Sequence, residues 1–569
     1  MKKFLVLSLA LTMVLSMVAC TKPAEPEAPA SSTAPETLTG VGLGFGGEIK
    51  VTVTREGDKI TAVVAEGPNE TPGMGTPALE QLPLKIVEAN STDVEVISGA
   101  TVTSEGIIYA VNNALDPVKY PAPVAEVKDE KPPVEASAAE VFQGFGLSNM
   151  GRKGPGKDDK EVQVWSTNQV FANVLFDGEG KIISIYLDQL EVATPNYDGD
   201  GMPHFTGFPG QSYNFDENHD EKVDRVLEQT EENFFAEIQG WKTKKARGDA
   251  YRMGTGTWTE QAEKFEDLFT GMTVKEVEDW FIKYASDLNG RPLKDGSEKP
   301  EDKAKYDALS DDEKAMLADV TSSATMSLKD GHGDIIAAIK NAFEARVPLD
   351  IKAASAQGFG LVNTPRKGPG KDDKETQVWS INQVFANTLF DADGKIVAIY
   401  VDQLEVATPN YDGDGMPHFS GFPGQGGYNY DENHDEKVDG MTEDTEENFF
   451  AEIEGWKTKR QRGDAYRMGT GTWEQQMDKF QEIFVGKTVA EVEEWFAKYT
   501  SDLNGRPLKD GSDKPEDKAK YDALSDDEKA MLADVTSAAT MSLKDSHGDL
   551  IAAIKASFEN KVDIVLTVK

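Results

Sequence analysis

Three short stretches of hydroxyl-bearing and small residues could accept a covalently attached group. The first runs from Ser98 to Thr101, after an apolar run at 94–97 and before a pattern at 105–115 with apolar residues at three- and four-residue spacing. That spacing predicts an amphipathic helix. A Gly-containing turn would thus bring hydroxyls to a helix N-terminus, where free N–H groups favour a phosphate.

The other two stretches, 319–327 and 534–542, have a similar composition and also precede helical patterns. Their acceptor candidates are Thr325 and Thr540. Ser323 and Ala538 stand where the first stretch has Gly99, so a positive φ there would cost energy. The small or hydroxyl-bearing neighbours expected to shape the three turns are Ser98, Gly99, Ala100, Ser322, Ala324, Ser537 and Ala539.

The Ser-Gly-Ala-Thr turn resembles the flavinylation motif of the FMN-binding domain family. The family includes periplasmic flavoprotein subunits of the Nqr and Rnf complexes and extracellular electron-transfer lipoproteins. In the family, the Thr after the Ala carries FMN through a phosphoester bond. The resemblance implies covalent FMN at Thr101 and, by their similarity, at Thr325 and Thr540, up to three groups in all. It also implies a separate FAD-dependent flavin transferase as partner.

A second motif strengthens the resemblance. Residues 70–73, beginning with Glu70 and Thr71, resemble the Glu-Thr-Pro-Gly signature of the family and precede the turn in family order. Family motifs usually have an Asp six residues before the Thr. Asp319 and Asp534 satisfy this, whereas the first stretch has Glu95.

Composition excludes several functions. The formal charge of −41 argues against nucleic-acid binding, which needs clustered Lys and Arg. The only cysteine is Cys20, so a disulfide framework, a Cys-rich zinc site or a Cys-x-x-Cys-His haem site cannot form within one chain. Redox chemistry would therefore need a non-haem organic cofactor or a partner.

The N-terminus resembles an export address. A basic start at 1–3 leads into an apolar run at 4–19, long enough for a signal peptide and short for a membrane-spanning helix. Residues 17–20 resemble a bacterial lipobox, with Met where Leu is usual. We expect 1–20 to be a lipoprotein signal peptide with Cys20 as the lipidated residue. The alternative is a plain secretory signal that leaves Cys20 as a free thiol.

The remaining chain divides by composition and repetition. Residues 21–39 are rich in Pro, Ala, Glu, Ser and Thr, and predict a disordered tether. Residues 40–118 form a first unit, in which alternating apolar residues on both sides of a turn at 56–59 predict a β-hairpin. Residues 119–141 form a second Pro-, Glu- and Ala-rich linker.

Two near-identical long repeats follow, at 142–347 and 356–569, offset by 214 to 215 residues. Such a long period marks tandem domains. Each predicts a strand, a turn and a second strand before the Glu-Val-Ala-Thr-Pro segment that begins at Glu191 in the first copy. We expect residues 142–347 to fold as a unit by themselves.

An insertion of about 100 residues, mostly helical, precedes the acceptor turn of each repeat. Capping boxes at 273–276 and 310–313 predict helix starts. Its aromatic residues could form core or stack on a flavin. His332 and His547, just after the turns, could contact a cofactor, cap a helix or be exposed. We predict an α+β fold, built three times from a small antiparallel sheet and helices, with each cofactor turn joining a strand to a helix.

Acidic segments loosely like calcium loops occur at 198–200 and 216–220, but lack the Gly and Glu that such loops need, so we expect solvated turns and no metal site. We assign no catalytic residues, and whether the chain is an enzyme stays open. One functional hypothesis is a lipid-anchored electron carrier on the extracytoplasmic face of a bacterial membrane, passing electrons from a membrane donor, such as a quinone-linked dehydrogenase, to an external acceptor. The alternative is a surface binding or adhesion lipoprotein whose repeats lack functional flavin.

Overall fold

The structure is a computed structural model that divides into two compact units, Met1–Pro132 and Pro133–Lys569. It describes residues 35–44, 47–67, 76–97, 100–122, 134–158, 162–197, 199–215, 225–372, 375–411, 413–423, 428–430, 440–442 and 445–569. The expected signal peptide with Cys20 and residues 21–34 of the expected tether lie outside these residues, as do Glu70, Thr71, Ser98 and Gly99. Residues 36–39, predicted to belong to the disordered tether, instead begin strand β1 (Glu36–Gly44), because they pair with residues 52–55. Within these ranges, no helix combines the length and apolarity that a membrane span needs.

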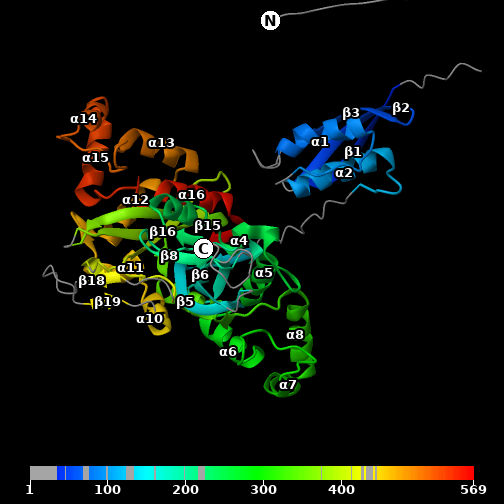
Figure 1. Cartoon of the computed structure of the whole chain (residues 1–569). Helices are drawn as coiled ribbons and strands as arrows, with labels where there is room; N and C mark the ends of the chain where they lie inside the picture. The colour runs from blue at the N-terminus through cyan, green and yellow to red at the C-terminus, as the bar shows by residue number, and fades with distance from the viewer. Residues whose placement is uncertain are drawn as a thin grey trace, which may run out of the picture. The chain divides into compact units, whose positions relative to one another are not determined.

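Unit 1 is a three-stranded antiparallel sheet packed on two helices (Figure 1). The predicted hairpin is present, as β2 and β3. Small residues bring helix α2 close to strand β1: a Cβ added to Gly40 would lie 2.0 Å from the Ala110 carbonyl oxygen. The elements are β1 (Glu36–Gly44), β2 (Gly47–Glu56), β3 (Lys59–Glu66), α1 (Thr76–Ala89) and α2 (Thr101–Leu115).

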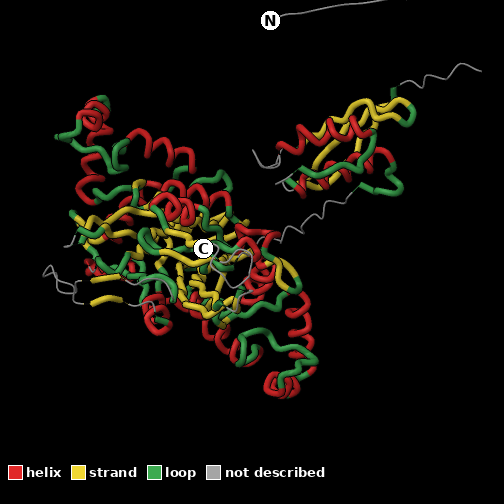
Figure 2. The backbone as a smooth tube through the Cα atoms, in the orientation of Figure 1, coloured by secondary structure: helices red, strands yellow, loops and turns green. Residues whose placement is uncertain are grey.

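Unit 2 contains both long repeats, with strands at its centre and helices around them (Figure 2). The two main sheets have the strand orders β14-β5-β6-β7 and β17-β16-β15-β24-β4. Their strands are β4 (Val134–Ala138), β5 (Val141–Lys157), β6 (Gln163–Asp177), β7 (Ile182–Ala193), β14 (Val347–Leu349), β15 (Ala353–Lys371), β16 (Gln377–Phe390), β17 (Ile396–Ala407) and β24 (Val562–Val568).

Each repeat places its last helix against its first strand, as unit 1 does. A Cβ added to Gly146 of β5 would lie 1.8 Å from the Ala338 carbonyl oxygen of α9, and one added to Gly360 of β15 would lie 2.0 Å from that of Ala553 in α16. Glycines permit this approach because they have no side chain. The recurring unit of antiparallel sheet and helix confirms the predicted α+β class.

The two insertions are mostly helical and lie at opposite ends of unit 2 (Figure 1). Both predicted capping boxes start helices, α6 at Thr273 and α8 at Ser310. The helices of the first repeat are α3 (Glu231–Gln239), α4 (Lys244–Arg247), α5 (Trp258–Phe269), α6 (Val274–Tyr284), α7 (Pro300–Asp307), α8 (Asp311–Ser323) and α9 (Ile335–Glu344). Those of the second are α10 (Glu446–Glu454), α11 (Lys459–Arg462), α12 (Trp473–Phe484), α13 (Val489–Tyr499), α14 (Pro515–Asp522), α15 (Asp526–Ala538) and α16 (Leu550–Glu559).

The repeats share one interior, which differs from the expectation that 142–347 folds by itself. Rings from both copies pack together; Phe171, for example, lies 5.3 Å from Phe359 and 5.5 Å from Phe385 between centroids. Buried amides also cross between the copies, because Asn173 donates to the Gly358 carbonyl at 3.1 Å. The alternating strand pattern predicted buried sheet faces, but it did not indicate that the apolar residues of each repeat pack against those of the other.

The segment before the first repeat belongs to the sheet of the second. Strand β4 pairs in parallel with β24, which in turn pairs with β15. Residues 134–138, predicted to be part of the linker 119–141, therefore form an edge strand of unit 2. Backbone hydrogen bonding, not composition, gives this segment its structure.

Candidate functional site

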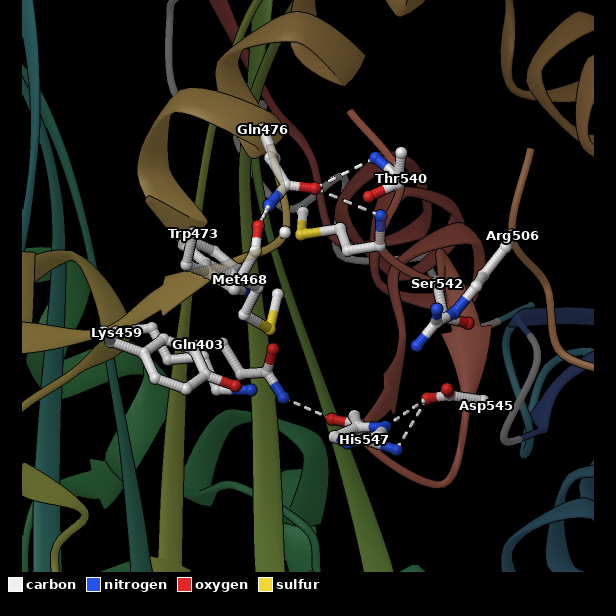
Figure 3. Close-up of a pocket in the computed structure, with 13 residues that line it drawn as sticks. Gln403, Lys459, Met468, Trp473, Gln476, Arg506, Thr540, Ser542, Asp545 and His547 are labelled. Atoms are coloured by element: carbon white, nitrogen blue, oxygen red, sulfur yellow. Dashed lines mark hydrogen bonds and ion pairs between the residues drawn. The ribbon is translucent and has the colours of Figure 1, made fainter. Parts of the chain in front are cut away.

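The second repeat contains a pocket beside Thr540 (Figure 3), here called the Thr540 pocket. Its volume is about 190 Å³, and the half-buried Thr540 contributes to its wall. Aromatic and thioether groups line one part of it and polar or charged groups another. The lining residues are Gln403, Lys459, Tyr466, Met468, Gly469, Trp473, Gln476, Arg506, Thr540, Met541, Ser542, Asp545 and His547.

Gln476, fully buried on α12, fixes the backbone around Thr540. Its side-chain oxygen accepts from the N–H groups of Thr540, at 2.9 Å, and Met541, at 3.2 Å (Figure 3). Its side-chain NH₂ donates to the carbonyl of Met468. One amide therefore joins the acceptor segment to the neighbouring hairpin of β20 (Arg467–Met468) and β21 (Gly471–Thr472).

Two further contacts hold the acceptor segment from its flanks. Thr470 donates to the Ala538 carbonyl at 2.8 Å, and Ser542 donates to the Asn504 carbonyl at 2.6 Å. Gly505, at φ 62°, packs against this segment so closely that a Cβ would lie 2.3 Å from the Lys544 carbonyl oxygen. The Thr540 backbone is thus bonded on both sides before any ligand is present.

The acceptor turns of the repeats differ from the prediction in their placement. Thr325 and Thr540 each follow the C-terminus of a helix, α8 or α15, and the next helix begins ten residues later, at Ile335 or Leu550. The predicted helix N-terminus is therefore not what surrounds these two threonines. Nine residues separate each threonine from the final helix of its repeat, so neither threonine lies at the N-terminus of that helix.

The missing glycine costs nothing in the repeats. Ser323 and Ala538 are the last residues of α8 and α15. Among the described residues, the non-Gly residues at positive φ are Asn90 and Glu375. Helical φ angles suit any L-residue, so these positions do not need glycine.

Next to the pocket lies a buried ionic cluster centred on Glu405 of β17. Its carboxylate contacts Lys459 at 3.1 Å and Arg366 at 2.6 Å, and Lys459 is 2% exposed. Burial alone would raise the pKa of Glu405, but the charges of Lys459 and Arg366 outweigh it and hold the pKa at about 2. The carboxylate is therefore ionised at neutral pH, and Lys459 places a buried cation on the pocket.

His547 and Asp545 form a second polar pair in the pocket, with 2.9 Å between His547 Nδ1 and the carboxylate (Figure 3). Burial raises the pKa of Asp545, but the hydrogen bond from His547 outweighs it and the net shift is downward. Gln403 donates to the His547 carbonyl and so ties this loop to β17. Of the uses left open for His547, the structure gives it contact with the pocket.

The first repeat reproduces these contacts around Thr325. Gln261 accepts from the N–H groups of Thr325 and Met326 at 2.8 and 2.9 Å. Glu191 contacts Lys244 at 3.0 Å and Arg152 at 2.7 Å. The two repeats thus carry the same arrangement twice.

In unit 1, Thr101 is the first residue of α2 and Ala100 its N-cap residue, as the sequence predicts. The residues before the turn, 94–97, form no strand. Ser104 is buried, and its hydroxyl accepts from the Ile97 N–H at 3.0 Å, which fixes the chain at the start of the helix. The side chain of Thr101 lies outside what the structure describes.

The aromatic residues of the insertions divide between two roles. Trp473 is 2% exposed and lines the Thr540 pocket. Trp280 belongs to the core of the first repeat, and Phe234 and Trp241 to the core shared by the repeats. The core role considered from the sequence therefore occurs, and Trp473 combines it with a place in the wall of the Thr540 pocket. No group of three His, Cys, Asp or Glu residues suited to a metal is found among the described residues.

The most informative site residues were missed by sequence reasoning. Gln476 and Lys459 lie far from the acceptor threonine in the chain, and neither belongs to a motif. Glu191 and Glu405 were noticed only as part of a repeated segment. The available signal was a charged residue within an otherwise apolar strand, which predicts a buried charge with a partner.

The Thr540 pocket fits a flavin mononucleotide in its chemistry. Trp473, Tyr466 and Met468 offer apolar surface to an aromatic ring system, Lys459 offers a donor to its polar edge, and Arg506 offers a cation to a phosphate near the Thr540 hydroxyl. Among the described residues, the Arg506 side chain has no carboxylate partner within ion-pair distance, although the chain is strongly acidic.

Comparison with known proteins points to the same cofactor. Residues 44–116 match the family described as the FMN-binding domain. The chain is 36% identical to the chlorophenol reductase of Desulfitobacterium hafniense over 227 residues, which are 37% of this chain and 60% of that protein. It is 25% identical to the NADH:acrylate oxidoreductase of Vibrio harveyi over 256 residues, 45% of this chain and 24% of that protein.

A third relative is the urocanate reductase of Eggerthella lenta, 36% identical over 81 residues, 14% of this chain and 13% of that protein. The chain therefore covers less than two thirds of the length of each of these relatives. The matched region contains the Ser98-to-Thr101 turn and helix α2. Residues 44–116 of this chain are therefore similar to the FMN-binding domain family.

Proposed function

We propose that this protein is a multi-flavin electron carrier, with FMN bound through phosphoester bonds to Thr101, Thr325 and Thr540. The observation that carries the proposal for the repeats is the Thr540 pocket, where a threonine hydroxyl, an aromatic wall and Arg506 come together, and Arg506 has no carboxylate partner in the described part of the chain. Support for Thr101 comes from the family match and from its place at the start of α2. Reductases among the relatives support a redox role.

When bound, FMN supplies the capacity to accept and release electrons. The chain's own residues would position and shield it. Gln476 fixes the acceptor backbone, Trp473 would supply apolar surface to the ring system, and Arg506 would neutralise the phosphodiester. A dedicated FAD-dependent flavin transferase would make the bond, and a membrane dehydrogenase linked to quinone would supply the electrons that pass to an external acceptor.

The test is the intact mass of protein produced with an active flavin transferase. Each single Thr→Val change at 101, 325 or 540 should remove one FMN and leave two, because valine keeps the shape and lacks the hydroxyl. The triple variant should carry no covalent flavin and keep its circular dichroism spectrum. Wild-type protein with one FMN, confined to Thr101, would remove the repeats from this function and favour the binding or adhesion alternative for them.

We further propose that Cys20 carries lipid and anchors the protein on the extracytoplasmic face of a bacterial membrane. The apolar run that ends at Cys20 supports this. Cys20→Ala should move the protein from the membrane fraction to the soluble fraction after cell lysis. Unchanged membrane attachment of the variant would exclude Cys20 as the anchor.

A further inference from the structure

The two kinds of flavin site differ in their buried charge. At the Thr540 pocket, Lys459 is 2% exposed and Glu405 is the one carboxylate with which it forms an ion pair within the described residues. Glu405 also binds Arg366, so that two cations share one carboxylate. Lys459, Arg366 and the exposed Arg506 are three cations in or beside the pocket, and Glu405 and Asp545 are two carboxylates. Together they leave one net positive charge when His547 is neutral.

Unit 1 contains no counterpart of Lys459 among its described residues. Its buried polar side chains are Thr103, Ser104 and Asn113, and none of its described charged residues is buried. The segments that flank the Thr101 site, 68–75 and 94–115, contain no Lys or Arg, whereas Glu70, Glu95 and Glu105 are acidic. Lys85 of α1 donates to the Glu95 carbonyl at 3.5 Å, but it is only half-buried, whereas Lys459 is 2% exposed.

A fixed positive charge in a poorly solvated pocket stabilises the more electron-rich state of the group beside it, whereas acidic surroundings oppose that state. We infer that the Thr540 pocket holds its flavin at a higher midpoint potential than the Thr101 site, so that electrons pass from unit 1 to the repeats. Thr325, with the same Lys244–Glu191–Arg152 contacts, belongs with Thr540.

This direction of electron transfer rests on the proposed flavins, and it adds the sequence in which they are reduced and oxidised. In each transfer the reduced flavin at Thr101 is oxidised and the oxidised flavin at Thr540 or Thr325 is reduced, with equal numbers of electrons lost and gained. Protons released at one site and taken up at the other exchange with water. An N-terminal anchor would then place the donor flavin in the unit that follows the tether.

The test compares single-flavin proteins by spectroelectrochemical titration. The Thr325→Val/Thr540→Val protein reports on Thr101, and the Thr101→Val/Thr325→Val protein reports on Thr540. We expect the higher potential at Thr540. In the latter protein, Lys459→Met should reduce the preference for reduced over oxidised flavin at least tenfold, which lowers a two-electron potential by about 30 mV.

Two variants control the measurement. Lys457→Met removes the same charge from an exposed position two residues away and should leave the potential unchanged. Lys459→Met combined with Glu405→Gln removes one positive and one negative charge, so that Arg366 alone keeps the cluster at one net positive charge. The potential of this charge-balanced variant should therefore stay close to that of the parent protein.

Intact mass is measured first and separates the two hypotheses. Absence of flavin on Thr540 would contradict the proposed function and this inference with it. Flavin on Thr540 at a potential equal to or below that of Thr101, or at a potential unaffected by Lys459→Met alone, would overturn the inference without affecting the proposed function.

Discussion

At the scale of single residues, the acceptor threonines of the repeats depend on a distant glutamine. Gln476 and its counterpart Gln261 each accept two backbone N–H groups at the acceptor and are themselves buried. Buried N–H groups need a partner, because leaving one unpaired costs about 1–3 kcal/mol. The position of the acceptor hydroxyl is therefore decided by a side chain of another helix.

This predicts the effect of Gln476→Met, which keeps the length of the side chain and removes the acceptor. The free energy of unfolding of unit 2 should fall by about 1–3 kcal/mol, measured by urea denaturation. Flavin attachment at Thr540 should fall while Thr325 stays loaded. Gln239→Met, at an exposed position on α3, is the matched control and should change neither quantity. Full flavin attachment at Thr540 in the Gln476 variant would show that the hydrogen bonds between Gln476 and the acceptor backbone are not needed.

At the scale of elements, the contact between the first strand and the last helix of each repeat defines the fold. Glycines at this contact let the strand backbone and the helix backbone come so close that no side chain would fit between them. The same contact in unit 1 joins Gly40 and Gly42 to α2. The same strand–helix contact occurs in unit 1 and in both repeats. It explains why all three keep the same arrangement of sheet and helix despite different loop lengths and insertions.

Gly360→Ala should separate this contact in the second repeat, because the added Cβ would meet the Ala553 carbonyl oxygen at 2.0 Å and backbone cannot rotate away. We expect a loss of about 1–3 kcal/mol in the free energy of unfolding. Gly240→Ala, at a helix C-cap with ordinary φ and no contact below 3.2 Å, is the control and should be nearly neutral. Equal stabilities of the two variants would contradict the packing argument.

At the scale of the whole molecule, the repeats behave as an internal pair. Each insertion sends a helix to the other copy: Lys153 of β5 contacts Glu446 of α10 at 2.7 Å, and Lys367 of β15 contacts Glu231 of α3 at 2.6 Å. These exposed ion pairs add little stability by themselves. The shared aromatic interior between the copies supplies the larger contribution, through buried apolar area.

Fragments test this arrangement. Residues 35–122 and residues 133–569 should each give a cooperative unfolding transition, since each contains a complete core. Residues 142–347 alone should aggregate or dimerise, because the faces of Phe171 and Phe205 lose their partners from the second copy. Size-exclusion chromatography and thermal unfolding would report both, and a stable monomer of 142–347 would refute a shared interior.

Local pattern and composition determined much of this protein. Alternation over residues 47–66 predicted the unit 1 hairpin, capping boxes predicted the starts of α6 and α8, and the turn ending at Thr101 was correctly placed at a helix start. Each of these depends on residues close in sequence. The repeat itself could be identified because the two copies are nearly identical in sequence.

Only the tertiary structure decided what surrounds Thr325 and Thr540. A turn resembling that of unit 1 predicted a helix N-terminus, but these threonines follow the end of another helix, and nine residues separate each of them from the final helix of its repeat. Their pocket is made by Gln476, 64 residues away, and Lys459, 81 residues away along the chain, and no local pattern encodes such a meeting. The same holds for the shared interior, because an apolar strand face indicates burial and does not identify its partner.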